Sequence, residues 1–512
     1  MSLHDWFERS SVHPGAPGLR SLAVSHNEWR RIAEDMAAAG GRLMALWATP
    51  SGEAGARVHA AFLAEIGGLV LTLSMLKPEE PYPGIDDVFP SAARMQRAVT
   101  DTSGLRSTAA DTRPWLRHAG WPEGYRPLLD PPLTRPYTEP TADSYDFVRV
   151  EGDGVHEIAV GPVHAGTIEP GHFRFSVVGE KVLRLEERLG YVHKGIEQRF
   201  TQLPLLQAHR LAARISGDSA VAFSWAYCQA LEGLSNTEIP PRAAWLRALY
   251  LELERVANHL GDLGALGNDA GFAFGLMQFS RLKEILLRTH QDTFGQRYLM
   301  DAIVPGGTLQ DLARPKYSAL SQCIRDIQQE VETLHTIYGE HAGVRDRFTG
   351  AGTVTPELAA RLGLTGLACR ASGKAYDLRV DLPCDPYQQL NVTKVVYADG
   401  DVDARVAIRF DELRESCRLI QYILGMLPEG AHCTPMRLPT DGAVAAGLIE
   451  GWRGPVWIAL EAGPDGTIRR CHPHDPSWQN WPAIEHAIMG NIVPDFPLIN
   501  KSFNLSYSGH DL

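Results

Sequence analysis

The sequence predicts an α+β protein with a small N-terminal α/β domain and a larger, mainly α domain. The larger domain is expected to contain a helical bundle, a β-hairpin at its start and small peripheral sheets. Short apolar runs at 42–48 and 67–73 are typical of strands, whereas the apolar stripe at 241–263 has the period of a helix, and a second helix is expected at 277–294. The Pro- and Thr-rich stretch at 131–145 separates the two kinds of pattern.

The composition is that of an ordinary globular protein with an ample core. The 512 residues are 44% hydrophobic and 21% charged, and the net charge of −12 argues against nucleic acid as a direct partner. The seven cysteines are scattered without C-x-x-C spacing, so the sequence predicts neither a zinc nor an iron-sulfur site in this chain. The longest apolar run, Ile66 to Leu76, is too short to span a bilayer, so we expect no direct membrane insertion.

The N-terminal quarter divides into two parts. Residues 1–20 contain Pro and Gly without periodicity, which predicts a flexible arm. Residues 82–105, YPGIDDVFPSAARMQRAVTDTSGL, resemble the signature of the 30-kDa subunit of respiratory complex I, although Gln96 stands where that family has glutamate. This resemblance implies a 30-kDa-like domain at 21–130. The positions in register are Phe89, Pro90, Ala92, Arg97, Asp101 and Gly104.

A linker is expected at 131–145, because proline fixes φ and favours an extended chain. It leaves 146–512 as the second domain. The alternating runs 173–178 and 181–187, separated by Gly179, predict a β-hairpin near the start of that domain.

The stretch 214–232, RISGDSAVAFSWAYCQALE, resembles the first metal-ligand motif of the nickel-iron hydrogenase large subunit. The family motif is R-I-C-G-x-C-x-x-x-H. Ser216 and Ser219 stand at the two cysteine positions, and Phe223 stands at the histidine. Taken without the resemblance, S-G-D-S is also an ordinary loop composition.

Two further segments extend the resemblance to group 4 hydrogenases and to the 49-kDa subunit of complex I. GPVHAGTIEPGHFRF, at 161–175, is closer to the formate hydrogenlyase type. In the closing segment, Ser506 and Gly509 stand where the family has its last two cysteines. Nickel and iron require soft thiolate ligands, and a serine hydroxyl is a hard donor that stays protonated. The resemblance therefore implies that all four metal ligands are absent and that this chain binds no metal.

We expect the former metal site to survive as a polar, hydrated pocket. Asp218 would then require a partner, for which Arg214 and Arg255 are the candidates; alternatively, Asp218 caps the helix that follows. The predicted pocket residues are His164, Glu169, Arg214, Ser216, Gly217, Asp218, Ser219, Phe223, Ser506 and Gly509, with His510 nearby. We also expect the C-terminal segment to be buried through Ile499, Phe503, Leu505 and Tyr507.

A candidate proton relay consists of Asp218, Glu252, Arg255 and His259. The last three lie at i, i+3 and i+7 of the predicted helix 241–263 and share one face. An exposed ion pair on a solvated face is the alternative. His472 and His474 have a spacing that suits a metal site on a strand, but a surface loop is the favoured interpretation.

Three functions follow from the resemblance. An active nickel-iron hydrogenase is disfavoured by the missing ligands. A quinone-reducing subunit would need a displaced site, because the family's quinone tyrosine aligns with Gly217 and its histidine falls near Pro170. The third is a coupling or scaffold subunit.

The favoured hypothesis is a nickel-free component of a complex I-like or formate-hydrogenlyase-like assembly that couples electron transfer to ion translocation. Its partners would be a 20-kDa-like iron-sulfur small subunit, a ferredoxin-like iron-sulfur subunit and antiporter-like membrane subunits. These would hold the chain peripherally on the cytoplasmic face of the membrane. The iron-sulfur clusters would belong to the partners, and quinone is the one ligand left open for this chain.

Overall fold

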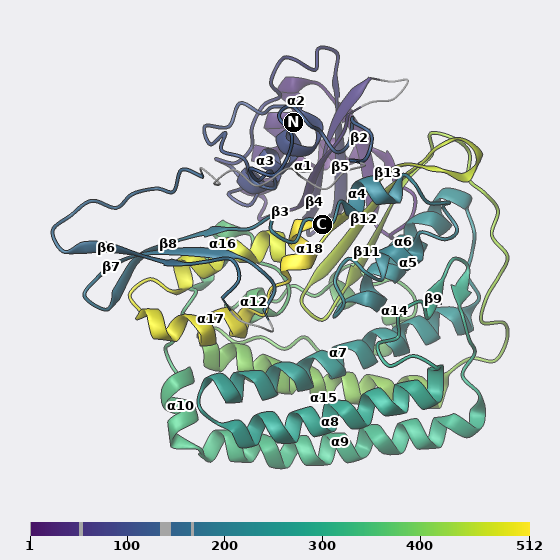
Figure 1. The fold of residues 1–512 in the computed structure, drawn as a ribbon. Helices are drawn as coiled ribbons and strands as arrows, with labels where there is room; N and C mark the ends of the chain where they lie inside the picture. The colour runs from purple at the N-terminus through teal and green to yellow at the C-terminus, as the bar shows by residue number, and fades with distance from the viewer. Residues whose placement is uncertain (1, 51–54, 134–144, 165–167) are drawn as a thin grey trace.

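The computed structural model describes residues 2–50, 55–133, 145–164 and 168–512. It confirms the α+β class, with an N-terminal α/β domain above a mainly helical body (Figure 1). The expected linker at 131–145 lies mostly outside the described residues.

The N-terminal domain is built on a five-stranded sheet in the order β1-β2-β5-β4-β3, in which β2 and β5 are parallel and the other neighbours are antiparallel. Three helices accompany it. The elements are α1 (Leu3–Arg9), β1 (Ser11–Val12), β2 (Leu19–Val24), α2 (His26–Ala38), β3 (Arg42–Thr49), β4 (Ala56–Ala64), β5 (Gly67–Met75) and α3 (Ala92–Ser103).

The flexible arm expected at 1–20 is wrong for the residues that the structure describes. Trp6 and Phe7 on α1 are buried, and the indole of Trp6 donates to Asp35 at 2.8 Å. Ser2 and Asp5 form a capping box that begins the helix. Two aromatic side chains are sufficient to dock a short terminal segment that lacks any periodic pattern.

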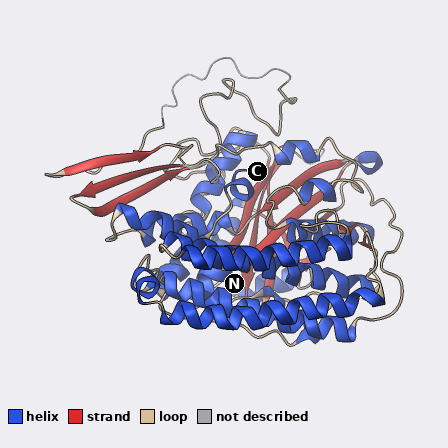
Figure 2. Ribbon diagram, turned by 60° about the horizontal axis from the view of Figure 1, so that its bottom comes forward, coloured by secondary structure: helices blue, strands red, loops and turns tan. Residues whose placement is uncertain are grey.

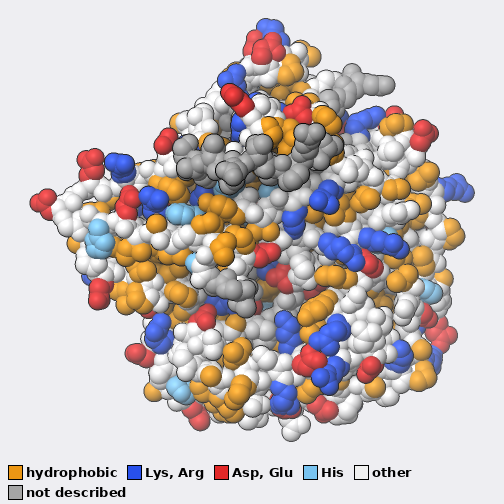
Figure 3. Space-filling model, viewed as in Figure 1, with side chains coloured by type: hydrophobic (Ala, Val, Ile, Leu, Met, Phe, Trp, Pro, Cys, Tyr) orange, Lys and Arg blue, Asp and Glu red, His pale blue; other side chains and the backbone are white. Residues whose placement is uncertain are grey.

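A three-stranded antiparallel sheet projects from the body as an arm (Figures 1 and 2). It consists of β6 (Val155–Val160), β7 (His172–Val178) and β8 (Lys181–Arg188). The predicted hairpin corresponds to β7 and β8, and β6 adds a third strand. Hydrophobic side chains gather on this side of the molecule (Figure 3), and the exposed ones in the arm and its flanking loops include Val163, Ile168, Val178 and Leu183.

Four long helices form the predicted bundle. Helix α7 (Pro241–Asp269) packs against α8 (Ala273–Phe294) and α15 (Val402–Met426), and α9 (Arg314–Glu340) packs against α8 and α15. The predicted apolar stripe of α7 is fully buried at Leu246, Leu249, Leu253, Val256 and Leu260. Short elements connect the bundle: β9 (Ile303–Val304), β10 (Gly307–Thr308), α10 (Ala342–Phe348), α11 (Pro356–Leu362), α12 (Gly366–Ala371), α13 (Leu378–Asp381) and α14 (Tyr387–Leu390).

A second antiparallel sheet lies between the N-terminal domain and the bundle, in the order β11-β12-β13. Its strands are β11 (Val444–Glu450), β12 (Pro455–Ala462) and β13 (Ile468–His474), and α6 (Ala220–Ser235) packs on β11 and β12. The remaining helices are α4 (Ile196–Phe200), α5 (His209–Ala212), α16 (Ser477–Ala487), α17 (Phe496–Phe503) and α18 (Tyr507–Asp511), with single 3₁₀ turns at 464–466 and 493–495.

Two expectations for the C-terminal part have different outcomes. Ile499, Phe503, Leu505 and Tyr507 are buried, as predicted; they lie on α17, in the loop that follows it and on α18. His472 and His474 do not lie in a surface loop, because they are buried on β13. His472 itself stacks on Trp47 of the N-terminal domain, with ring centroids 5.4 Å apart, and that contact is not visible in the local sequence.

Candidate functional site

The three serines at the expected ligand positions meet in one buried place. Ser216 and Ser219 lie in the turn between α5 and α6, and Ser506 begins α18. The hydroxyls of Ser216 and Ser506 are 2.8 Å apart although they are 290 residues apart in the chain. The C-terminal segment therefore packs against the 214–232 segment.

Asp218 lies at the edge of this serine group and pairs with Arg453. A guanidinium nitrogen of Arg453 is 2.5 Å from one carboxylate oxygen, and the Ser216 hydroxyl donates to the other at 2.7 Å. Ser219 donates to that second oxygen at 3.3 Å. Burial would raise the pKa of Asp218, but the charge and hydrogen bond of Arg453 and the serine hydroxyls hold it below its usual 3.8.

Neither arginine expected to meet Asp218 does so. Arg214 points away and forms an ion pair with Asp301 at 2.6 Å. Arg255 donates to the carbonyls of Glu450 and Gly451. The partner is Arg453, in the turn G-W-R-G at 451–454 directly after β11, and no local pattern in the sequence marks it as the partner of Asp218.

Asp218 does not cap α6 either. Glu254, on α7, takes that role: its carboxyl oxygens accept from the backbone N–H of Val221 at 2.7 Å and of Ala222 at 3.3 Å. Burial raises the pKa of Glu254 to about 8. The side chain of Asp218 is therefore free for the serines and Arg453, while its backbone carbonyl accepts from Trp452 and Asn258.

The residues present do not fit a nickel-iron centre. The hydroxyls of Ser216 and Ser506 are already hydrogen-bonded to Asp218, to each other and to the N–H of Gly509. A Cβ atom at Gly509 would lie 2.5 Å from the carboxylate of Asp475, so a fourth ligand side chain has no room there. Within the ranges that the structure describes, no three His, Cys, Asp or Glu side chains are placed to hold a metal ion.

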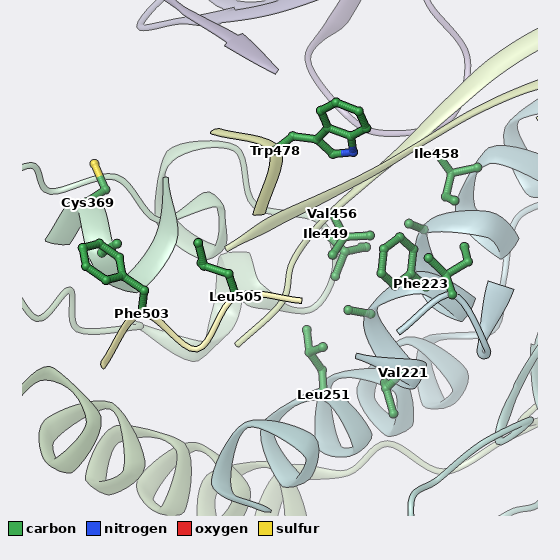
Figure 4. Close-up of a cluster of buried hydrophobic side chains, with 14 of the residues drawn as sticks. Val221, Phe223, Leu251, Cys369, Ile449, Val456, Ile458, Trp478, Phe503 and Leu505 are labelled. Atoms are coloured by element: carbon green, nitrogen blue, oxygen red, sulfur yellow. The ribbon is translucent and has the colours of Figure 1, made fainter. Parts of the chain in front are cut away.

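The other predicted pocket residues lie at or beyond the border of the serine group. Glu169 is exposed and accepts from the N–H of Ser508 at 2.9 Å, whereas His164 is exposed and bonds to the carbonyl of Gly161. His510 is buried against Trp478, with ring centroids 4.1 Å apart. Phe223 belongs to the hydrophobic core between α6 and the sheet β11-β12-β13, where it lies among Ile449, Val456 and Ile458 (Figure 4).

The remaining relay candidates form a separate buried network. His259 lies 3.2 Å from Glu412, and Arg255 lies 3.4 Å from Glu252. Their hydrogen bonds within the described residues do not include the side chain of Asp218. All three are fully buried, so the alternative of a solvated helix face is wrong. The acids and arginines that complete the network, Arg370, Asp377, Arg379, Glu412 and Glu450, come from distant segments that the helix pattern does not predict.

Asp218 also borders a cavity of about 200 Å³ between α7, α8 and the loop that follows α8. Lys283 lines it and has no ion pair or hydrogen bond within the described part of the chain. His290 lines it as well and is almost fully buried. Burial lowers the pKa of Lys283 below its usual 10.5. The other lining residues are Gly217, Glu254, Ala257, Asn258, Leu287, Arg297, Tyr298 and Leu299.

Comparison with known proteins places these features in a family. The model of the respiratory-chain NADH dehydrogenase 49 Kd subunit matches residues 269–445. The chain is 30% identical to formate hydrogenlyase subunit 5 of Escherichia coli (strain K12) over 441 residues, which cover 85% of this chain and 77% of the relative.

Two other relatives come from different complexes. The chain is 28% identical to the C/D subunit of NADH-quinone oxidoreductase from Bacteroides fragilis, covering 82% of this chain and 83% of the relative. It is 26% identical to the membrane-bound hydrogenase subunit alpha of Pyrococcus furiosus, and the match covers 66% of this chain and 83% of that relative. In this chain, no helix of the described residues is both long and apolar enough to cross a membrane.

Proposed function

This chain belongs to the family of nickel-iron hydrogenase large subunits and complex I 49-kDa subunits, and a 30-kDa-like domain is fused at its N-terminus. From this premise we propose its function. The proposed function is that of a nickel-free component of a complex I-like or formate-hydrogenlyase-like membrane-associated assembly. Within that assembly the former metal site handles protons in place of a metal, and the chain couples electron transfer between partner clusters to ion translocation.

One observation carries this proposal: an aspartate–arginine pair lies against the serines that stand, with Gly509, at the four expected ligand positions. Hydroxyls and a carboxylate in hydrogen-bond contact can pass a proton, whereas they cannot hold nickel and iron. Asp218 is half-buried and borders both the serine group and the cavity. It is therefore the group that connects solvent to the interior of the former metal site.

The proposed partners follow from the family. We propose a 20-kDa-like iron-sulfur small subunit, a ferredoxin-like iron-sulfur subunit and antiporter-like membrane subunits, which hold the chain at the inner face of the cytoplasmic membrane. The exposed apolar side chains of the arm support the presence of partner subunits, since patches of this kind mark interaction surfaces. The clusters that carry electrons belong to those partners.

Two measurements test the proposal on the purified complex. Plasma mass spectrometry is expected to find no nickel, and stoichiometric nickel would overturn it. Asp218→Asn is expected to lower proton translocation while leaving the complex assembled, with Asp301→Asn as the control because Asp301 pairs with the peripheral Arg214. Unchanged translocation in an intact Asp218→Asn complex would reduce the site to a structural role.

A displaced quinone site is the second candidate, and the cavity favours it. Gly217, at the position of the family's quinone tyrosine, lines this cavity together with Leu287, His290 and Leu299. Such a mixture of apolar walls and a few polar groups is typical of small-molecule sites. Titration with a quinone analogue distinguishes the two functions: saturable binding that Lys283→Met and Leu287→Trp weaken supports the quinone site, and no binding leaves the coupling or scaffold role.

A further inference from the structure

A network of eight buried ionisable side chains includes Glu450, three residues before Arg453, and we call it the buried charge cluster. Each member is at most 4% exposed, and each is within 4.0 Å of an oppositely charged or chargeable member. Its carboxyls are Glu252, Asp377, Glu412 and Glu450. Its bases are Arg255, Arg370, Arg379 and His259.

The cluster contains one more carboxyl than guanidinium. Arginine stays protonated in proteins, so with all carboxyls ionised the cluster would carry one uncompensated negative charge unless His259 were protonated. An unpaired charge in a water-excluded interior is costly, and a titratable group there binds a proton instead. Nearby, Arg409 lies 2.8 Å from Asp262, which matches its positive charge, so Arg409 does not neutralise the excess negative charge of the cluster.

Three of the four carboxylates are well stabilised as anions. Glu252 accepts from Arg379, from the Tyr387 hydroxyl at 2.7 Å and from the Ser416 hydroxyl at 2.6 Å. Asp377 receives two hydrogen bonds from the Arg379 guanidinium, at 2.7 and 3.1 Å. Glu412 accepts a hydrogen bond from Nε of Arg370 at 2.8 Å, forms an ion pair with the same guanidinium at 2.6 Å, and lies next to His259.

Glu450 has the weakest support as an anion. It accepts one guanidinium nitrogen, from Arg370 at 3.0 Å, and the N–H of Leu378 at 3.2 Å. Burial, with Asp377 nearby, raises the pKa of Glu450, whereas the arginines around Asp377 and Glu412 outweigh burial and lower the pKa of both.

His259 is the other group that can take the proton, and its surroundings disfavour this. Its Nε2 lies 3.2 Å from Glu412, but its buried Nδ1 has no hydrogen-bond partner among the described residues. An imidazolium would bury an unsatisfied N–H, while the neutral ring with the proton on Nε2 leaves only a lone pair there. Burial, with Arg255 and Arg409 close by, lowers the pKa of His259.

We propose that the buried charge cluster binds one exchangeable proton and that this proton resides on the carboxyl of Glu450. Glu450 lies close in the chain to the site described above. Glu450 begins the segment 450–453, whose Trp452 and Arg453 both bond to Asp218, and Arg255 of the cluster holds the carbonyls of Glu450 and Gly451. The use of this proton in a relay rests on the proposed function, but its presence does not.

Infrared spectroscopy of the purified full-length chain tests the proposal directly. A protonated carboxyl has a carbonyl stretch above the amide bands that shifts on transfer to D₂O. The spectrum of wild type minus Glu450→Gln is expected to contain such a band near neutral pH, amounting to about one carboxyl per chain. A difference spectrum without this band overturns the proposal, as does a band without a D₂O shift.

Two further variants make the test specific. Glu412→Gln removes one carboxylate, so three carboxylates then balance three guanidiniums and Glu450 is expected to ionise; the same band should disappear although Glu450 is present. Glu232→Gln is the control, because Glu232 is a buried carboxylate matched one to one with Arg247, and it should leave the band unchanged. Persistence of the band in Glu412→Gln would contradict the charge-balance argument.

Circular dichroism of each variant excludes unfolding as the cause of a lost band, and Glu412→Gln supplies an independent answer if Glu450→Gln does not fold. The outcome is also separable from the proposed function. If the band behaves as expected but Asp218→Asn leaves translocation unchanged, the proton site stands and the relay fails.

Discussion

At the scale of single residues, Arg453 determines the electrostatics around Asp218 and the serine group. It is 3% exposed, stacks over Trp452 with 4.3 Å to the ring centroid, and donates to the carbonyl of Asn504 at 2.6 Å. These contacts hold the guanidinium in position independently of its ion pair with Asp218. A preorganised cation of this kind stabilises the carboxylate where water is partly excluded.

We predict that Arg453→Gln raises the pKa of Asp218. The guanidinium opposes the effect of burial in the native protein, so its loss leaves burial as the larger influence. Carbon-13 NMR titration of the carboxyl groups measures the change. Arg214→Gln is the matched control and should leave the pKa of Asp218 as it is, because Arg214 pairs with Asp301; equal titration in the two variants would contradict the assignment of Arg453 as the partner.

At the scale of elements, the sequence predicts periodic structure well and the site only in part. The stripe on α7 and the alternation in β7 and β8 are local patterns, and both are confirmed. The pairing of Asp218 with Arg453 joins residues 235 positions apart, and no local pattern contains it. Glu254 resembles any charged residue on α7, and only the docking of α6 makes it a cap.

The cap on α6 predicts a pH-dependent stability. The folded-state pKa of Glu254 is raised to about 8 from 4.5, so the stability it contributes is present below pH 4.5 and is lost as the pH rises through about 8. The difference in unfolding free energy between wild type and Glu254→Gln should therefore fall by a few kcal/mol over that range, at about 1.4 kcal/mol per pKa unit. Urea unfolding at several pH values measures it, and a constant difference would contradict the raised pKa.

The C-terminal helices predict a large effect of truncation. A chain that ends after Asn500 loses the buried side chains of Phe503, Leu505 and Tyr507, together with the Ser506 hydroxyl that bonds to Ser216. We expect a loss of more than about 5 kcal/mol, since each large buried side chain contributes roughly 2–5 kcal/mol. Denaturant unfolding compares the truncated chain with Leu505→Ala, which should lose about 2–5 kcal/mol. A truncated chain as stable as Leu505→Ala would contradict the docking of this segment.

At the scale of the whole molecule, the N-terminal domain and the sheet β11-β12-β13 share a core. Trp47 lies between the rings of His59 and His472, with centroids 5.0 and 5.4 Å away, and also contacts Trp457. Arg57 pairs with Glu461 at 2.9 Å across the same contact. The sequence predicts two domains divided by a linker, but it contains no sign that their sheets pack together. The buried strand β13, with its two histidines, is a consequence of that packing.

This shared core predicts that the two domains unfold together and that one substitution separates them. Trp47→Ala removes the side chain at the centre of the contact and should cost about 3–5 kcal/mol. Calorimetry is expected to show one transition for the wild type and an earlier, separate transition of the N-terminal domain for the variant. Phe62→Ala serves as the control, because Phe62 is equally buried but packs against Phe89 inside the N-terminal domain. It should lower the single transition without splitting it, and a split in both variants would show that the interface does not couple the domains.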